Sequence, residues 1–125
     1  MKYLLDSNAI IALVMNLDAR LVSRAGECDE GDLVTSAIAY AEVAHGSTRG
    51  KTPASDQLKA FVEEVRVLDF DYKAAQAYAA LPFRRGSYDR LIAAHALSQD
   101  LILVTANESD FADVPDLIVE NWTLA

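Results

Sequence analysis

Short apolar runs alternate with longer helical segments along the whole of this 125-residue chain. The apolar runs lie at residues 2–5, 33–35, 65–68, 101–104 and 117–119. They are nearly continuously apolar, which is typical of strands that are covered on both faces. The helical patterns lie at residues 8–15, 19–25, 37–45, 54–64, 72–81 and 88–99. Because strands that alternate with helices pair in parallel, the pattern predicts a layered α/β fold with a parallel sheet between helices.

Capping residues and helix breakers predict where several helices begin and end. Ser36 and Ser87 are the predicted N-caps of two helices, and Asp6 or Ser7 is the predicted N-cap of the first. Gly46 is predicted to end the helix that Ser36 begins, because glycine commonly follows the last helical turn.

The charge balance limits the partners that the chain can bind. The 19 acidic residues outnumber the 11 basic ones and give a net charge of −8. Such a surface argues against nonspecific binding to nucleic acid, which depends on basic residues. It does not exclude a nuclease whose site is built from carboxylates, since cations bound there would offset the repulsion of phosphate. It also suits a basic protein partner.

The lone cysteine and the N-terminus indicate the compartment. Cys28 cannot form an internal disulfide and is typical of a reduced, cytosolic protein. The N-terminal apolar run ends at Asp6 and is too short for a signal peptide. No apolar stretch approaches the roughly 20 residues of a membrane-spanning helix. We therefore expect a cytoplasmic protein without a membrane segment, with residues 1–125 forming one domain.

Four carboxylates are predicted to meet at one edge of the sheet. Asp6 directly follows the first strand, and Asp110 follows the strand at 101–104 through a short turn. Glu42 lies on the helix after the second strand, and Asp89 lies in the first turn of a later helix. Folds of this kind bind ligands beyond the carboxyl ends of their strands, near the point where the strand order reverses. We expect the four acids to converge there.

Each acid also has a simpler interpretation. Asp6 could be only a helix cap, Asp89 only a favourable charge at a helix N-terminus, and Asp110 only a turn residue. Glu42 shares a predicted helix face with Ile38, Ala41 and His45. A charged side chain on such a face is costly to bury unless a cation offsets the charge. Alternatively, the Glu42 carboxylate could reach solvent at the edge of the helix.

A cluster of carboxylates implies a particular chemistry. Four such groups repel one another unless cations lie between them. Hard oxygen ligands, with one cysteine and 2 histidines in the chain, suit Mg²⁺ or Mn²⁺ better than zinc. These ions promote phosphodiester hydrolysis by activating water and stabilising the leaving oxygen, so no other side chain is needed as the nucleophile.

Four segments and the last part of the sequence form an ordered set of motifs: YLLDSN (3–8), SAIAYAEVAHG (36–46), YDRLIAAHAL (88–97), LVTANESDF (103–111) and VENW (119–122). Together they resemble the motifs of PIN-domain nucleases, and most closely those of the VapC-type toxins of toxin–antitoxin pairs. Their order spans nearly the whole chain. Ser7 departs from the threonine that is commoner there, and the segment 81–87 is shorter than in many relatives, which bears on the choice of RNA.

The resemblance implies a PIN-domain fold with about five parallel strands, and an endoribonuclease that depends on Mg²⁺ or Mn²⁺. It implies that the metal ligands are Asp6, Glu42, Asp89 and Asp110, with Asp6 and Asp89 the firmest. It further implies polar residues that would orient these acids, at Asn8, Ser36, Thr105 and Asn107.

The resemblance also implies partners: a homodimer, a tRNA or ribosomal RNA substrate, and a VapB-like antitoxin. Such antitoxins insert a C-terminal segment, often with an arginine, into the acidic pocket. The net charge of −8 fits that partner.

Other residues leave alternatives open. Arg84, Arg85 and Arg90 flank Asp89 and could contact phosphate, or could be solvated or ion-paired. We expect His45 and His95 to be packed and hydrogen-bonded rather than general bases.

Four other classes of protein are alternatives to the nuclease. A phosphoacceptor receiver domain would need paired acids after the first strand and a late lysine, and an aspartyl phosphatase would need an acid where Asn8 stands. A non-catalytic PIN-like binding module should lack some of the four acids. A DNA-directed nuclease of related fold is the nearest enzymatic alternative.

Overall fold

The computed structural model describes residues 1–82 and 87–124 of the chain. Five strands form one sheet: β1 (Tyr3–Leu5), β2 (Leu33–Ser36), β3 (Arg66–Leu68), β4 (Ile102–Val104) and β5 (Val119–Glu120). Their spatial order is β3-β2-β1-β4-β5, and every neighbouring pair is parallel. The predicted parallel sheet is confirmed. The strand order reverses between β1 and β4, which places the expected ligand edge at the ends of these two strands.

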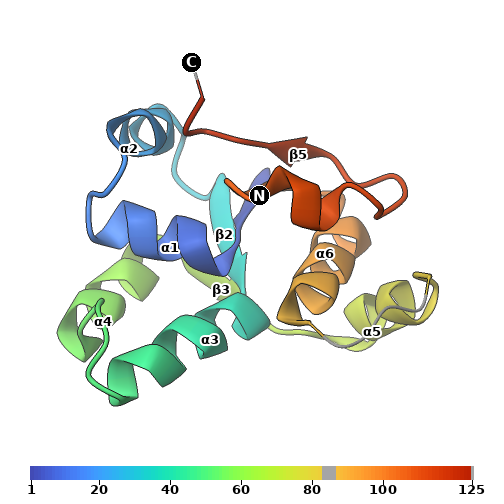
Figure 1. Ribbon diagram of the computed structural model, residues 1–125, viewed down its shortest axis with the longest axis horizontal. Helices are drawn as coiled ribbons and strands as arrows, with labels where there is room; N and C mark the ends of the chain where they lie inside the picture. Colours follow the sequence, from blue (N-terminus) through green and yellow to red (C-terminus); the bar gives the residue numbers. More distant parts are fainter. Residues whose placement is uncertain (83–86, 125) are drawn as a thin grey trace.

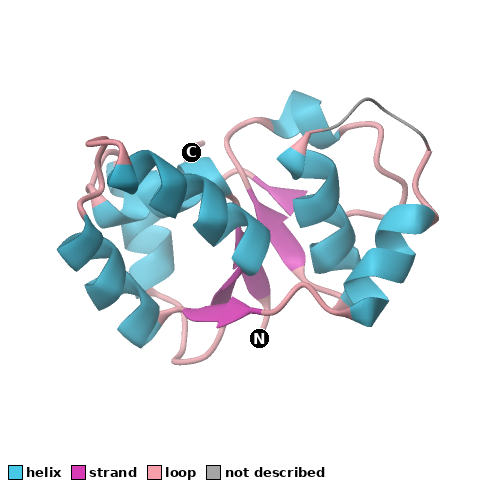
Figure 2. Ribbon diagram, turned by 90° about the horizontal axis from the view of Figure 1, so that it is seen from below, coloured by secondary structure: helices cyan, strands magenta, loops and turns pink. Residues whose placement is uncertain are grey.

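Helices cover both faces of the sheet, as the sequence predicted. They are α1 (Ser7–Val14), α2 (Ala19–Gly26), α3 (Ala37–Thr48), α4 (Ser55–Glu64), α5 (Tyr72–Ala79), α6 (Tyr88–Ser98) and the 3₁₀ helix η1 (Glu108–Phe111). Figure 1 shows α1, α3 and α4 together, with α5 and α6 across the sheet from them. The view in Figure 2 shows the strands between the two groups of helices. Among the described residues, no helix is long and apolar enough to cross a membrane.

The two central strands form the middle of the core. Leu4 and Leu5 of β1 and Leu103 and Val104 of β4 are fully buried. Their side chains alternate between the two faces of the sheet, and both faces are covered, so successive residues can all be apolar.

At the start of β1, the ring of Tyr3 packs edge to face against the ring of Trp122, with the ring centroids 4.9 Å apart. This contact fastens the last segment of the chain to the first strand.

Helix α3 does not end where the sequence predicted. Gly46 lies inside the helix, where glycine costs only about 1 kcal/mol relative to alanine, and α3 continues to Thr48. The end is set by Gly50, which has a φ of 82° and so takes the left-handed conformation that closes a helix. The N–H groups of Gly50 and Lys51 donate to the carbonyls of Ser47 and Gly46, at 3.1 and 3.0 Å. The correct residue type was predicted at the wrong position.

Candidate active site

Asp6 lies where β1 ends and α1 begins. Its carboxylate accepts a hydrogen bond of 2.8 Å from the N–H of Ala9, so it is the N-cap of α1, one of the two predicted alternatives. Its own N–H donates to the carbonyl of Val104 in β4, at 3.2 Å. The residue is 4% exposed. Backbone and side-chain bonds therefore hold this carboxylate rigidly at the junction of the two central strands.

Thr105 joins the end of β4 to the same carboxylate. This buried residue directly follows the strand. Its hydroxyl accepts a bond of 3.0 Å from the N–H of Asn107 and donates to the carboxylate of Asp6. Thr105 therefore contacts Asp6, and its implied role in orienting a metal ligand stays a prediction.

Glu42 reaches the site from α3 with the help of Ser7. The hydroxyl of Ser7 donates to Oε1 of Glu42 at 2.7 Å, which ties α3 to the first turn of α1. The sequence left open whether Glu42 is buried or reaches solvent at the helix edge, and the structure places it at the edge of the core face. The core face of α3 is formed by Ala39 and Val43, whereas Glu42 is half-buried and His45 is exposed. Glu42 directly precedes Val43, so the face that carries Glu42 adjoins the core face. The small apolar residues along α3 do not show in the sequence which of the two faces is buried.

Asp89 and Asp110 approach from the other side. Asp89 is half-buried in the first turn of α6, and its N–H donates to the hydroxyl of the N-cap Ser87 at 3.1 Å. Asp110 lies in η1, just after β4, and is exposed. The predicted N-caps Ser36 and Ser87 are both confirmed.

The four carboxylates act on one another electrostatically. Burial raises the pKa of Asp6 above its ordinary value, and the charges of Asp89 and Glu42 raise it further, against the hydrogen bonds from Thr105 and Ala9. Burial also raises the pKa of Asp89, and the charges of Asp110 and Glu42 add to it. Asp6 and Asp89 are therefore the inner members of a coupled group, with Glu42 and Asp110 around them.

The chemistry of this group suits a divalent cation. All four donors are hard carboxylate oxygens, and a cation would offset the repulsion that raises the pKa of the inner pair. As the side chains stand, no three of the acidic, histidine or cysteine residues in the described ranges are arranged so as to enclose an ion. The acids share one edge, but they do not form a closed cage.

Comparisons with known proteins agree with this fold. The PIN domain family matches residues 3–117. The chain belongs to the PIN-domain family. This PIN domain is similar to the tRNA(fMet)-specific endonuclease VapC of Shigella flexneri, at 31% identity over 98% of the chain and 99% of that protein. It is 30% identical to Ribonuclease VapC2 of Rickettsia felis, with 98% of each protein covered.

Solved structures give the same result. The PIN domain superposes on a chain of VapBC2 from Rickettsia felis bound to a promoter DNA fragment, with a TM-score of 0.86, 26% identity and coverage of 98% and 99%. It superposes on a chain of VapBC-1 from nontypeable Haemophilus influenzae with a TM-score of 0.80, 31% identity and coverage of 99% and 100%.

The arginine that follows Asp89 is part of the structure of this PIN domain. Arg90 is 4% exposed, and its guanidinium donates to the Asp113 carboxylate at 3.3 Å and to the Pro82 carbonyl at 3.2 Å. Of the two alternatives for Arg90, the ion pair is the one found. Arg84 and Arg85 lie outside the described residues. The sequence analysis missed the Arg90–Asp113 contact and the Ser7–Glu42 contact, since both join residues far apart in the chain.

The remaining polar positions of the PIN domain divide into two kinds. His95 is fully buried and hydrogen-bonded, as predicted. His45 was expected to be packed but is exposed, with its Nδ1 3.4 Å from Nη1 of Arg49. Asn8 and Asn107 are also exposed, so neither is held among the core residues.

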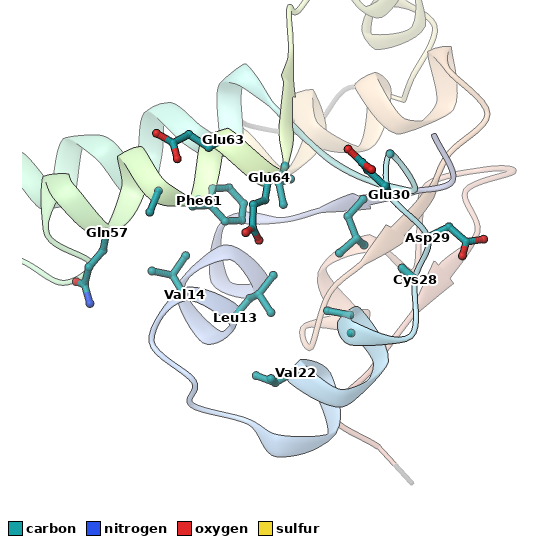
Figure 3. Close-up of a pocket in the computed structure, with 16 residues that line it drawn as sticks. Leu13, Val14, Val22, Cys28, Asp29, Glu30, Gln57, Phe61, Glu63 and Glu64 are labelled. Atoms are coloured by element: carbon teal, nitrogen blue, oxygen red, sulfur yellow. The ribbon is translucent and has the colours of Figure 1, made fainter.

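A groove lies away from the carboxylates, between α1, α2 and α4. Its volume is about 840 Å³, comparable with the pockets that bind ligands. Apolar side chains of the three helices line it: Leu13, Val14, Val22 and Phe61. Acidic residues are also part of the lining: Asp29, Glu30, Glu63 and Glu64. Figure 3 shows Phe61 and Glu64 of α4 opposite Leu13 and Val14 of α1.

Proposed function

We propose that this PIN domain is a VapC-type endoribonuclease that hydrolyses phosphodiester bonds of RNA and acts as the toxin of a type II toxin–antitoxin pair. The proposed metal ligands are Asp6, Glu42, Asp89 and Asp110, with Mg²⁺ or Mn²⁺ as the ion. The observation that carries this proposal is the electrostatic coupling of these acids at the edge where the strand order reverses. A non-catalytic PIN-like module would have no need to retain four mutually repelling carboxylates.

The side chains of the site have distinct roles in this proposal. Asp6 is held by Ala9 and Thr105, so its carboxylate would hold the ion from a fixed position. Ser7 directs Glu42 toward the same edge. When bound, the divalent cation supplies an activated water and stabilises the leaving oxygen of the RNA. Until then, the acids repel the phosphate backbone, so substrate binding depends on the loaded site.

The first prediction is that cleavage requires a divalent ion held by Asp89. Purified protein with Mg²⁺ or Mn²⁺ should cleave RNA, and a chelator should abolish cleavage. Asp89→Asn should reduce the cleavage rate by about a hundredfold or more, because it removes a charged ligand. Asp56→Asn is the matched control, since Asp56 is also an acid in the first turn of a helix, α4. If Asp89 only stabilises its helix, both variants will cleave alike, and undiminished cleavage with chelator would exclude the metal mechanism.

We further propose that the substrate is a structured RNA such as tRNA. Two relatives are named as tRNA(fMet)-specific endonucleases, which favours initiator tRNA as the first RNA to assay. The same cleavage assay with initiator tRNA, elongator tRNA and ribosomal RNA, read by sequencing the 5′ ends of the products, distinguishes these substrates. We propose that the protein acts in the cytoplasm, where it would cleave this RNA.

We propose that the partner is a VapB-like antitoxin, which contacts the groove between α1, α2 and α4. Two of the solved relatives are VapBC pairs. The apolar lining of the groove with its acidic residues suits an amphipathic segment that carries basic residues. The PIN domain is proposed to form a homodimer within that complex.

The second prediction tests this partner. Glu64→Lys should weaken binding of the cognate antitoxin by about tenfold at low salt, because it puts like charges together. RNA cleavage by the free protein should be unchanged, as Glu64 is exposed and lies outside the carboxylate group. Asp100→Lys makes the same charge change at an exposed turn elsewhere and should bind normally. If calorimetry gave both variants the same affinity for the antitoxin, the antitoxin would not contact the groove.

A further inference from the structure

His95 forms a buried polar contact that the proposed chemistry does not use. It lies on α6, and its Nδ1 is 2.7 Å from the hydroxyl of Ser36 at the end of β2. Both residues are fully buried. The contact joins residues 59 positions apart and connects α6 to the start of α3. Those are the two helices that carry Asp89 and Glu42.

The hydroxyl of Ser36 has two tasks. As the N-cap of α3 it accepts a bond of 3.1 Å from the N–H of Ile38. Its own proton remains to be donated, and Nδ1 of a neutral His95 is the acceptor within reach. This pattern assigns the imidazole proton to Nε2. Burial lowers the pKa of His95, against the charges of Asp71 and Asp69 and the Asp69 backbone, so the ring favours this neutral form.

The stability of the folded protein does not by itself explain why position 95 is a histidine. Phe70 packs edge to face on it, with centroids 5.4 Å apart. Nε2 is buried, and within the described part of the chain it has no well-aligned hydrogen-bond partner, although the Asp69 backbone is near. A buried donor without a good partner costs stability, and an apolar side chain would avoid that cost. The contact with Ser36 is the interaction that an apolar residue could not replace.

We propose that His95 is a positioning residue that holds Ser36, and with it the N-terminus of α3, against α6, so that Glu42 and Asp89 keep the separation that metal binding needs. This inference rests on the proposed function. The charges of Asp89 and Glu42 repel one another, which pushes α3 and α6 apart. The hydrogen bond between His95 and Ser36 opposes that repulsion. Residues that orient ligands in this way commonly change metal affinity by 10- to 100-fold, as an order of magnitude.

The test compares metal binding with stability. His95→Leu should melt close to the wild-type temperature, because it removes the poorly paired Nε2 but leaves the Ser36 hydroxyl without its acceptor. It should nevertheless bind Mn²⁺ about tenfold more weakly in calorimetry without RNA. His95→Asn keeps a polar group near the position of Nδ1 and should restore most of the affinity. Ser36→Ala removes the same bond from the other side and should weaken Mn²⁺ binding as well. Asp18→Ala removes the side-chain cap of α2, away from the site, and should lower the melting temperature without changing Mn²⁺ affinity.

A spectroscopic measurement tests the bond without the metal. The nitrogen spectrum of the imidazole in the metal-free protein should show His95 protonated at Nε2, and Ser36→Ala should shift the Nδ1 signal. Wild-type Mn²⁺ affinity in both His95→Leu and Ser36→Ala would overturn the positioning role while leaving the proposed function intact. A wild-type protein that binds no Mn²⁺ would overturn the proposed function, and the positioning role with it.

Discussion

Asp6→Asn should reduce RNA cleavage by at least about a hundredfold while leaving the fold unchanged. The side-chain oxygen of asparagine can still accept the hydrogen bond from Ala9, so α1 keeps its cap. What the substitution removes is the negative charge at the inner position of the carboxylate group. The cleavage rate and Mn²⁺ affinity of the purified variant measure this effect.

The same variant has an expected signature in stability. Because burial raises the pKa of Asp6, the folded protein holds this proton more tightly than the unfolded chain does. The contribution of Asp6 is therefore favourable at low pH and is lost as the pH rises from the ordinary pKa of 3.8 through the raised one. Without metal, Asp6→Asn should be at least as stable as the wild type at neutral pH, and its stability should fall less over that window.

Asp6→Ala separates the two roles of the residue. It removes both the charge and the cap, so it should lose cleavage and also be about 1 kcal/mol less stable than Asp6→Asn. Thermal melts from mildly acidic to neutral pH distinguish the two variants. Cleavage at the wild-type rate by Asp6→Asn, or a neutral-pH stability below that of Asp6→Ala, would contradict the role assigned to Asp6.

Arg90→Ala is expected to have the largest effect on stability. The guanidinium is buried and links α6 to Asp113 and to the carbonyl of Pro82. Truncation leaves a cavity and removes the donor from both acceptors. The Asp113 side chain is 46% exposed, so water compensates part of the loss. The free energy of unfolding should fall by about 2–3 kcal/mol.

The same substitution should also affect cleavage, because the partner Asp113 follows Asp110 by three positions and anchors that segment beside Asp89. Arg90→Lys keeps the charge but cannot span both acceptors with a planar fork, so an intermediate loss is expected. Arg66→Ala, at an exposed position of β3, is the control and should change little. Urea denaturation gives the stabilities, and equal values for Arg90→Ala and Arg66→Ala would show that the buried contacts contribute nothing.

The sequence predicted the sheet well because its strands are covered on both faces. The central strands are continuously apolar rather than alternating, as at Leu4, Leu5, Leu103 and Val104. Such a run is typical of a strand in a parallel sheet that is covered on both faces. The N-caps at Ser36 and Ser87 were predictable for a similar reason, since capping depends on local chemistry.

Contacts between distant segments were beyond prediction from local patterns. The hydrogen bond from Ser7 to Glu42 depends on how α1 packs on α3, which no local pattern specifies. The sequence could not decide between a buried Glu42 and one at the helix edge, because small apolar residues surround it on α3. Gly46 and Gly50 are the same residue type, and only the backbone conformation separates a helical glycine from one that ends a helix.

The reversal of strand order has a consequence for the synthesis of the protein. β1 is made well before its neighbour β4 and before Thr105, which contacts Asp6. A nascent chain that has left the ribosome only as far as α5 therefore has no partner on one side of β1 and no complete catalytic edge. Under the proposed function, such a nascent chain would not yet cleave RNA, because the edge that carries the carboxylates assembles only after β4 emerges.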